Sequence, residues 1–180
     1  MHVQIIDSII LYWRAEAGKE VIDMSTRPVS KHSGEASDII KQMLMEQNGR
    51  AVVHTARGLP CEIRAASDGI SFLSDKLPCN PPYRYEVFDV IVRLLVSRGG
   101  RARKGNGRGF RLGEPACDET TVVGAIGYNY ARKKTGDSVF DPVFVLAAVL
   151  EWAGIANNER GELVLTAGYQ AKLSQNKKHL

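Results

Sequence analysis

The 180-residue sequence has no apolar run that approaches the ~20 residues a membrane-spanning helix needs. Its first residues, MHVQIIDSIILYWRAEAG, have no basic lead, and Asp7 interrupts their apolar stretch early. The layout of a signal peptide is therefore missing. We expect a cytoplasmic protein with no membrane partner.

Cysteine is scarce, with only Cys61, Cys79 and Cys117, which are odd in number and widely spaced. Such a set forms no disulfide framework. None lies in a C-x-x-C pair or at zinc-finger spacing from a histidine. We expect reduced, packed thiols, no structural metal and no cofactor.

The sequence also lacks the established phosphate-binding loop motifs. Lys104 is followed by Gly105, with no adjacent Ser or Thr, so no Walker A loop is present. The string GNGRGF lacks the third glycine of a dinucleotide fingerprint and follows a helical pattern instead of a strand. We therefore expect no nucleotide-binding loop in this stretch.

A glycine-rich basic stretch, RGGRARKGNGRGFRLG (98–113), is the most distinctive feature present, with six basic residues, six glycines and no acid. The longer segment from Arg84 to Arg111 contains eight basic and two acidic residues, which gives it a net charge of +6. The whole chain has a net charge of +4, so the rest of the chain carries −2. A local positive field of this kind indicates an anionic partner such as nucleic acid.

We interpret this stretch as a mobile arm that orders on a polyanion, because guanidinium groups bind phosphates bidentately and glycines let backbone amides approach them. The predicted contacts are Arg98, Arg101, Arg103, Lys104, Arg108 and Arg111, with Arg132, Lys133, Lys134 and Arg160 as secondary candidates. The open alternative is a solvated connecting loop.

Hydrophobic periodicity predicts a small N-terminal region. Ile6, Ile9, Ile10 and Trp13 have the spacing of a short helix, which is a candidate homodimer contact. After a loop over 24–37, a second helix is expected from the N-cap Ser37 to Gly49. Residues 50–55, 60–65 and 69–74 are typical of a three-stranded antiparallel meander, and the prolines of 78–82 predict a linker.

The remaining sequence is mainly helical. Helices are expected over 85–98, from the cap Asp118 to about 134, and from the cap Asp141 with Pro142 in the first turn. The third of these is apolar nearly all round, which predicts the buried centre of its domain. Gly154 ends it, and two short strands flank the turn NNERG (157–161).

Three helices followed by a β-hairpin, closing on Leu163, Leu165, Thr166 and Gly168, resemble a winged-helix domain over residues 83–173. The resemblance implies a DNA-binding domain at 83–180 behind a helix-plus-meander region at 1–80. The helix after Asp141 is predicted to be buried in the core. Contacts with DNA are therefore expected from residues 120–134, from the glycine-rich basic stretch 98–113, or from the β-hairpin around 157–161 that corresponds to the wing.

Two enzymatic alternatives involve the meander. Glu62 and Asp68 are candidate acids for a metal-dependent nuclease or modification subunit. Two residues after Glu62, however, the sequence has Arg64 where such sites use a lysine. His54 and Cys61 are a candidate base and nucleophile across a hairpin. Trp13, Trp152 and Phe144 are expected in the core.

The sequence thus predicts an α+β fold and a non-enzymatic protein that binds nucleic acid, most directly double-stranded DNA. Its expected role is that of a transcription regulator or a DNA-reading component of a restriction or mobile-element system. A protein-interaction module, in which the basic loop is incidental, remains a third possibility.

Overall fold

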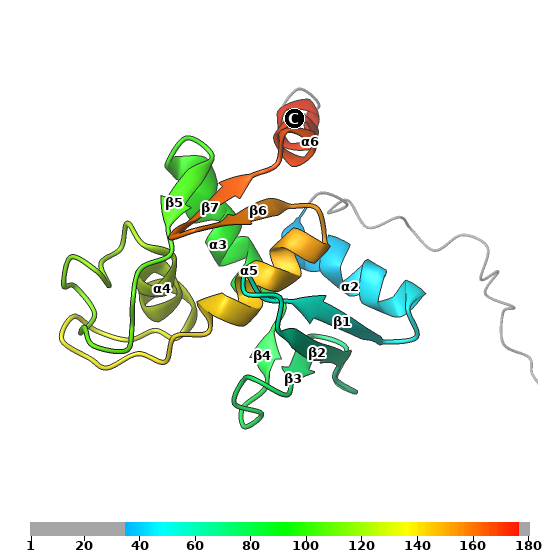
Figure 1. The fold of residues 1–180 in the computed structure, drawn as a ribbon, viewed down its shortest axis with the longest axis horizontal. Coiled ribbons are helices and arrows are strands. Elements are labelled where there is room, and N and C mark those ends of the chain that lie inside the picture. Colours follow the sequence, from blue (N-terminus) through cyan, green and yellow to red (C-terminus); the bar gives the residue numbers. More distant parts are fainter. Residues whose placement is uncertain (1–34, 177–180) are drawn as a thin grey trace, which may run out of the picture. The chain divides into compact units, whose positions relative to one another are not determined.

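The computed structural model describes residues 35–176. These residues form a mixed fold of helices and two antiparallel sheets (Figure 1), as the α+β prediction required. The predicted first helix, its Trp13 and its homodimer contact lie outside the described residues, as does nearly all of the predicted loop over 24–37.

The first described helix, α2 (Ala36–Glu46), buries Ile40 and Leu44 on one face. The predicted cap at Ser37 is wrong, because this residue lies inside the helix and its N–H donates to Asp89 Oδ1 at 3.0 Å. The predicted stop is confirmed, since Gly49 has a φ of 76° and its N–H donates to the Leu44 carbonyl at 2.7 Å.

The predicted meander is confirmed as β1 (Arg50–His54), β2 (Pro60–Ala65) and β3 (Ser71–Ser74). A fourth strand, β4 (Tyr83–Arg84), was not predicted, and it pairs antiparallel with β3 directly after the proline segment. The sheet order is β1-β2-β3-β4. Alternating burial along β1 and β2 turns one face of this sheet toward the core.

The second sheet is built from strands far apart in sequence. After α3 (Glu86–Ser97), β5 (Arg101–Arg103) pairs with β7 (Glu162–Leu165), which also pairs with β6 (Ala156–Glu159), so the order is β5-β7-β6. Between β5 and β6 lie α4 (Val122–Ala125), the π-helix η1 (Ile126–Tyr130) and α5 (Val143–Trp152). The chain continues from β7 into α6 (Ala167–Asn176).

The predicted cap of the second helix is wrong by three residues. Thr121 caps α4, with its Oγ1 accepting from the Gly124 N–H at 3.1 Å. The Asp118 carboxylate instead accepts from the N–H and Oγ1 of Thr120 at 3.0 and 2.7 Å. A Cβ at Gly124 would lie 1.7 Å from the Asp118 carbonyl oxygen, so only glycine fits there.

The helix predicted as a buried centre is confirmed. Seven of the ten residues of α5 are buried, and the Asp141 carboxylate accepts from the Val143 N–H at 3.1 Å, as a cap does. Phe144 contradicts the prediction, since it is 38% exposed. Trp152 is half-buried and packs against the core.

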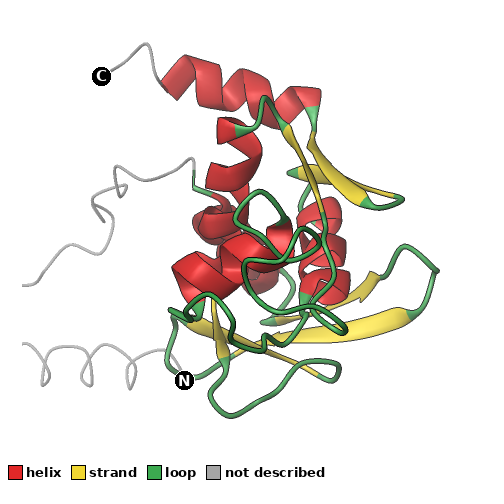
Figure 2. Cartoon of the chain, turned by 90° about the vertical axis from the view of Figure 1, so that its left-hand side faces the viewer, coloured by secondary structure: helices red, strands yellow, loops and turns green. Residues whose placement is uncertain are grey.

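One hydrophobic core joins the meander to the later elements. α3 and α5 lie between the two sheets (Figures 1 and 2): α5 contacts β1 and β6, whereas α3 contacts β5 and β7. Buried Ile63 and Phe72 of the first sheet belong to the same cluster as Leu146 of α5 and Leu163 of β7. The boundary predicted between residues 80 and 83 therefore does not coincide with a break in the core.

Candidate nucleic-acid interface

The glycine-rich stretch 98–113 is folded against the protein, which corrects the expectation of a mobile arm. Gly99 and Gly100, with φ of 73° and 95°, turn the chain from α3 into β5. Leu112, at the other end, is only 1% exposed. At Gly105 an added Cβ would lie 2.6 Å from Val123, so this backbone packs closely on α4.

Several of the predicted cations are engaged within the fold. Arg101 Nε donates to Glu162 Oε2 at 3.1 Å, and this hydrogen bonding lowers the pKa of the Glu162 carboxyl. An Arg103 guanidinium N–H donates to the Pro115 carbonyl at 3.2 Å. The positive charge of β5 is thus partly offset by the hairpin that it pairs with.

The next cations in the stretch have different environments. Lys104 Nζ donates to the Glu159 carbonyl, and burial lowers the pKa of its amine. Arg111 donates to Ser138 Oγ at 2.9 Å. Arg108 is exposed, and its guanidinium has no partner within residues 35–176.

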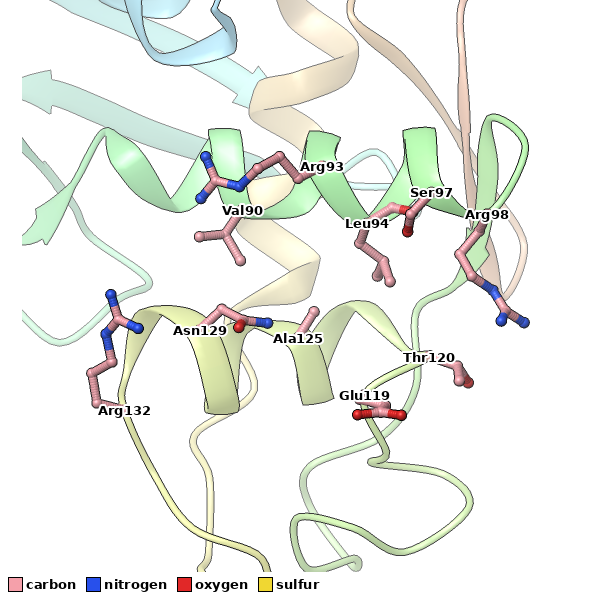
Figure 3. A pocket seen from close by; sticks show the side chains of 10 residues that line it. All are labelled: Val90, Arg93, Leu94, Ser97, Arg98, Glu119, Thr120, Ala125, Asn129 and Arg132. Atoms are coloured by element: carbon pink, nitrogen blue, oxygen red, sulfur yellow. The ribbon is translucent and has the colours of Figure 1, made fainter.

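A groove of about 560 Å³ runs along the contact between α3 and the α4–η1 segment (Figure 3). We call it the α3–α4 groove. Val90 and Leu94 of α3 point toward Ala125 across it, which makes its middle apolar. Its full lining is Val90, Arg93, Leu94, Ser97, Arg98, Glu119, Thr120, Ala125, Asn129 and Arg132.

Arginines occupy both ends of the α3–α4 groove. Arg93 and Arg132 lie toward one end, and Arg98 lies at the other end near Glu119 (Figure 3). Among the described residues none of these three guanidiniums forms an ion pair, and Glu119 is the one acid in the lining. The residues that line the groove therefore carry a net charge of +2.

Local backbone structure positions these arginines. Arg98 follows the last turn of α3, where the helix dipole favours a cation. On the other side, η1 widens the last turn, and Arg132 follows it with a φ of 55°. The Tyr130 ring stacks on Tyr83 with centroids 5.6 Å apart, which anchors η1 to the first sheet.

The structure brings together only two of the ten predicted contact residues, Arg98 and Arg132, in the α3–α4 groove. Lys104 and Arg108 line a different pocket. Lys133 and Lys134 follow η1, and Arg160 lies at the β6–β7 turn; all three are exposed.

Sequence reasoning missed Arg93 and Asn129. Arg93 is the one basic residue within α3 and is exposed between apolar neighbours, and that pattern was the available signal. Asn129 lies in a π-helix, whose altered periodicity removes the usual signal.

The meander does not assemble the acids proposed for a nuclease. Glu62 Oε1 pairs with Arg50 Nε at 3.0 Å and with Arg64 Nε at 3.4 Å. Asp68 accepts from the Ile70 N–H at 2.9 Å, which lowers the pKa of its carboxyl. Within residues 35–176, no three His, Cys, Asp or Glu side chains converge as metal ligands.

The structure does not bring His54 and Cys61 together as a base and a nucleophile. His54 is on the exposed face of β1, whereas Cys61 is buried and lies opposite Val53 on the other face of the sheet. The Cys61 Sγ contacts Ser74 Oγ at 3.0 Å, and burial raises the pKa of the Cys61 thiol. Cys117 is also buried, as expected, whereas Cys79 is exposed.

No protein family model matches the chain, and neither do the curated proteins or the solved structures with which it was compared. Among the described residues, no helix combines the length and apolar character needed to cross a membrane.

Proposed function

We propose that this protein is a non-enzymatic nucleic-acid-binding protein that holds the phosphate backbone of double-stranded DNA at the α3–α4 groove. The observation that carries the proposal is the presence of Arg93, Arg98 and Arg132 on one groove without ion-pair partners among the described residues. A regulatory or DNA-reading role, as in restriction or mobile-element systems, fits such binding.

The order of elements supports a winged-helix-like arrangement. α3, α4–η1 and α5 are three successive helices, and the β6–β7 hairpin follows them in the place of a wing. In this arrangement α5 precedes the wing, but its apolar side chains are buried between the two sheets. A buried helix cannot enter a major groove, so DNA is contacted by α3 and α4–η1 instead.

Arginine is suited to this task because its planar guanidinium can donate two parallel hydrogen bonds to one phosphate. Contacts of this type position a protein on the duplex without reading sequence. Each phosphate contact steepens the dependence of log K on log salt by about 0.9. Three contacts therefore contribute a slope of about −2.7, or roughly a 40-fold loss of affinity between 50 and 200 mM salt.

The test is to replace the three groove arginines together (Arg93→Ser, Arg98→Ser, Arg132→Ser) and to titrate duplex DNA at several salt concentrations. We expect weaker binding and a slope that is less steep by about 2.7. Parallel titrations with single-stranded DNA and duplex RNA identify the preferred polymer. Circular dichroism of the variant verifies that it is folded.

A matched variant with the same loss of charge (Lys41→Ser, Arg50→Ser, Lys172→Ser) changes cations outside the groove. We expect it to keep the native slope, because net charge alone does not create phosphate contacts. An equal loss of affinity in both variants would refute the groove as the site. Failure of the native protein to bind any of the three polymers would refute the proposed function and favour a protein-interaction module.

A further inference from the structure

A second pocket, of about 470 Å³, lies on residues that the α3–α4 groove does not use. It is formed by the β1–β2 turn, residues 104–108, the start of α5 and the strand β6. We call it the basic pocket. Its size is within the ~300–1,000 Å³ of pockets that bind small molecules.

Four cations line the basic pocket, namely Arg57, Lys76, Lys104 and Arg108, against the single acid Asp141. Lys76 is paired with Asp75 at 3.2 Å, and Lys104 donates to the Glu159 carbonyl. Arg57 and Arg108 are exposed and form no ion pair within the described residues. These two guanidiniums are therefore available to a phosphate.

The same pocket offers an exposed aromatic face. Phe144, in the first turn of α5, is 38% exposed, and Leu59 of the β1–β2 turn is 61% exposed. Aromatic side chains that stay exposed beside cations are typical of surfaces on which nucleobases stack.

The lining also includes a polar side chain, that of Asn158, with no hydrogen-bond partner in the part of the chain that the structure describes. Asn158 is opposite the buried Leu163 in the hairpin, so its side chain is on the inner face of β6. Its Oδ1 and Nδ2 are shielded from solvent and have no hydrogen-bond partner within the described residues. Leaving both atoms unpaired destabilises the fold, and an amide that offers a donor beside an acceptor matches the edge of a nucleobase.

From this combination we propose that the basic pocket binds a single nucleotide unit. Arg57 and Arg108 bind the phosphate, the base packs on Phe144, and the Asn158 amide turns to bind the base edge. The unit is either a free nucleotide or an unpaired nucleotide of a strand. The proposal does not rest on the α3–α4 groove.

The experiment compares adenosine monophosphate with ribose 5-phosphate, which has the same sugar and phosphate but no base, by calorimetric titration of the full chain. We expect adenosine monophosphate to bind about tenfold tighter, since stacking and base-edge contacts contribute on this scale. An octamer of single-stranded DNA without a terminal phosphate, titrated in parallel, distinguishes a nucleotide within a strand from a free one.

Variants assign each contact. Phe144→Ala and Asn158→Leu remove the base contacts, so each is expected to abolish the preference for adenosine monophosphate over ribose 5-phosphate. The double variant Arg57→Ser with Arg108→Ser is expected to lower the affinity for both ligands by about tenfold or more, because it removes the phosphate contacts. Arg50→Ser with Lys172→Ser is the charge-matched control and should bind both ligands as the native protein does.

Asn158→Leu has a second readout that separates binding from folding. Because the substitution removes a buried amide without partners, its urea midpoint should equal or exceed that of the native protein while the base preference is lost. Equal binding of the two ligands by the native protein would overturn the proposal, as would a base preference that survives both base-contact variants. Absence of binding by adenosine monophosphate and by the octamer would overturn it too.

Discussion

Replacing Leu146 by alanine tests the central structural argument, that α5 is core and does not read DNA. Leu146 is fully buried in the cluster between the two sheets. Leucine-to-alanine changes at such positions destabilise proteins by about 2–5 kcal/mol, since they remove apolar burial and leave a cavity. For a loss of about 3 kcal/mol in a chain of this length, the melting temperature falls by about 6–12 °C.

The assay combines urea unfolding with duplex titration well below the melting temperature. We expect Leu146→Ala to unfold at lower urea but, while folded, to bind duplex DNA within about twofold of the native protein. Phe144→Ala, on the same helix but 38% exposed, is the matched control and should lose less stability. A variant with native stability and much weaker DNA binding would refute the reasoning, because a recognition helix behaves in that way.

Two further predictions concern local structure. Gly124→Ala places a Cβ 1.7 Å from the Asp118 carbonyl oxygen, so it should destabilise the fold by about 1–3 kcal/mol or more in urea unfolding; a native midpoint would contradict the close approach. The hydrogen bond from the Ile70 N–H is the main cause that lowers the pKa of the Asp68 carboxyl in the folded protein. The stability that this carboxylate contributes is therefore present above its unfolded pKa of about 3.9 and is lost as the pH falls through the lower folded pKa. The chemical shift of Asp68, followed by NMR, should titrate below 3.9, and a midpoint at or above that value would show that the hydrogen bond has no effect.

Local patterns in the sequence were sufficient for several elements. The β-favouring residues of RAVVHT and PCEIRA, with turn residues between them, predicted β1 and β2, because branched side chains suit the extended backbone of a strand. The continuous apolar character of residues 143–150 predicted a buried helix, because such a helix has no face suited to water. In both cases the physical cause lies within a few consecutive residues.

Packing between distant segments could not be predicted in this way. The glycine-rich stretch has the composition of a flexible arm, but β5 within it pairs with β7, about sixty residues later. Likewise, the cap of α4 is Thr121 and not Asp118, because the Asp118 backbone packs against Gly124.

By itself the sequence determined the strands β1 to β3, the helix α5 with its burial and the local excess of positive charge, since these depend on neighbouring residues and composition. The tertiary structure alone decided which cations line the same groove. Arg101 is paired with Glu162 across β5 and β7, whereas Arg93, Arg98 and Arg132 line the α3–α4 groove. The electrostatic field of a charged group depends on its position in space, and contacts between residues far apart in sequence fix that position.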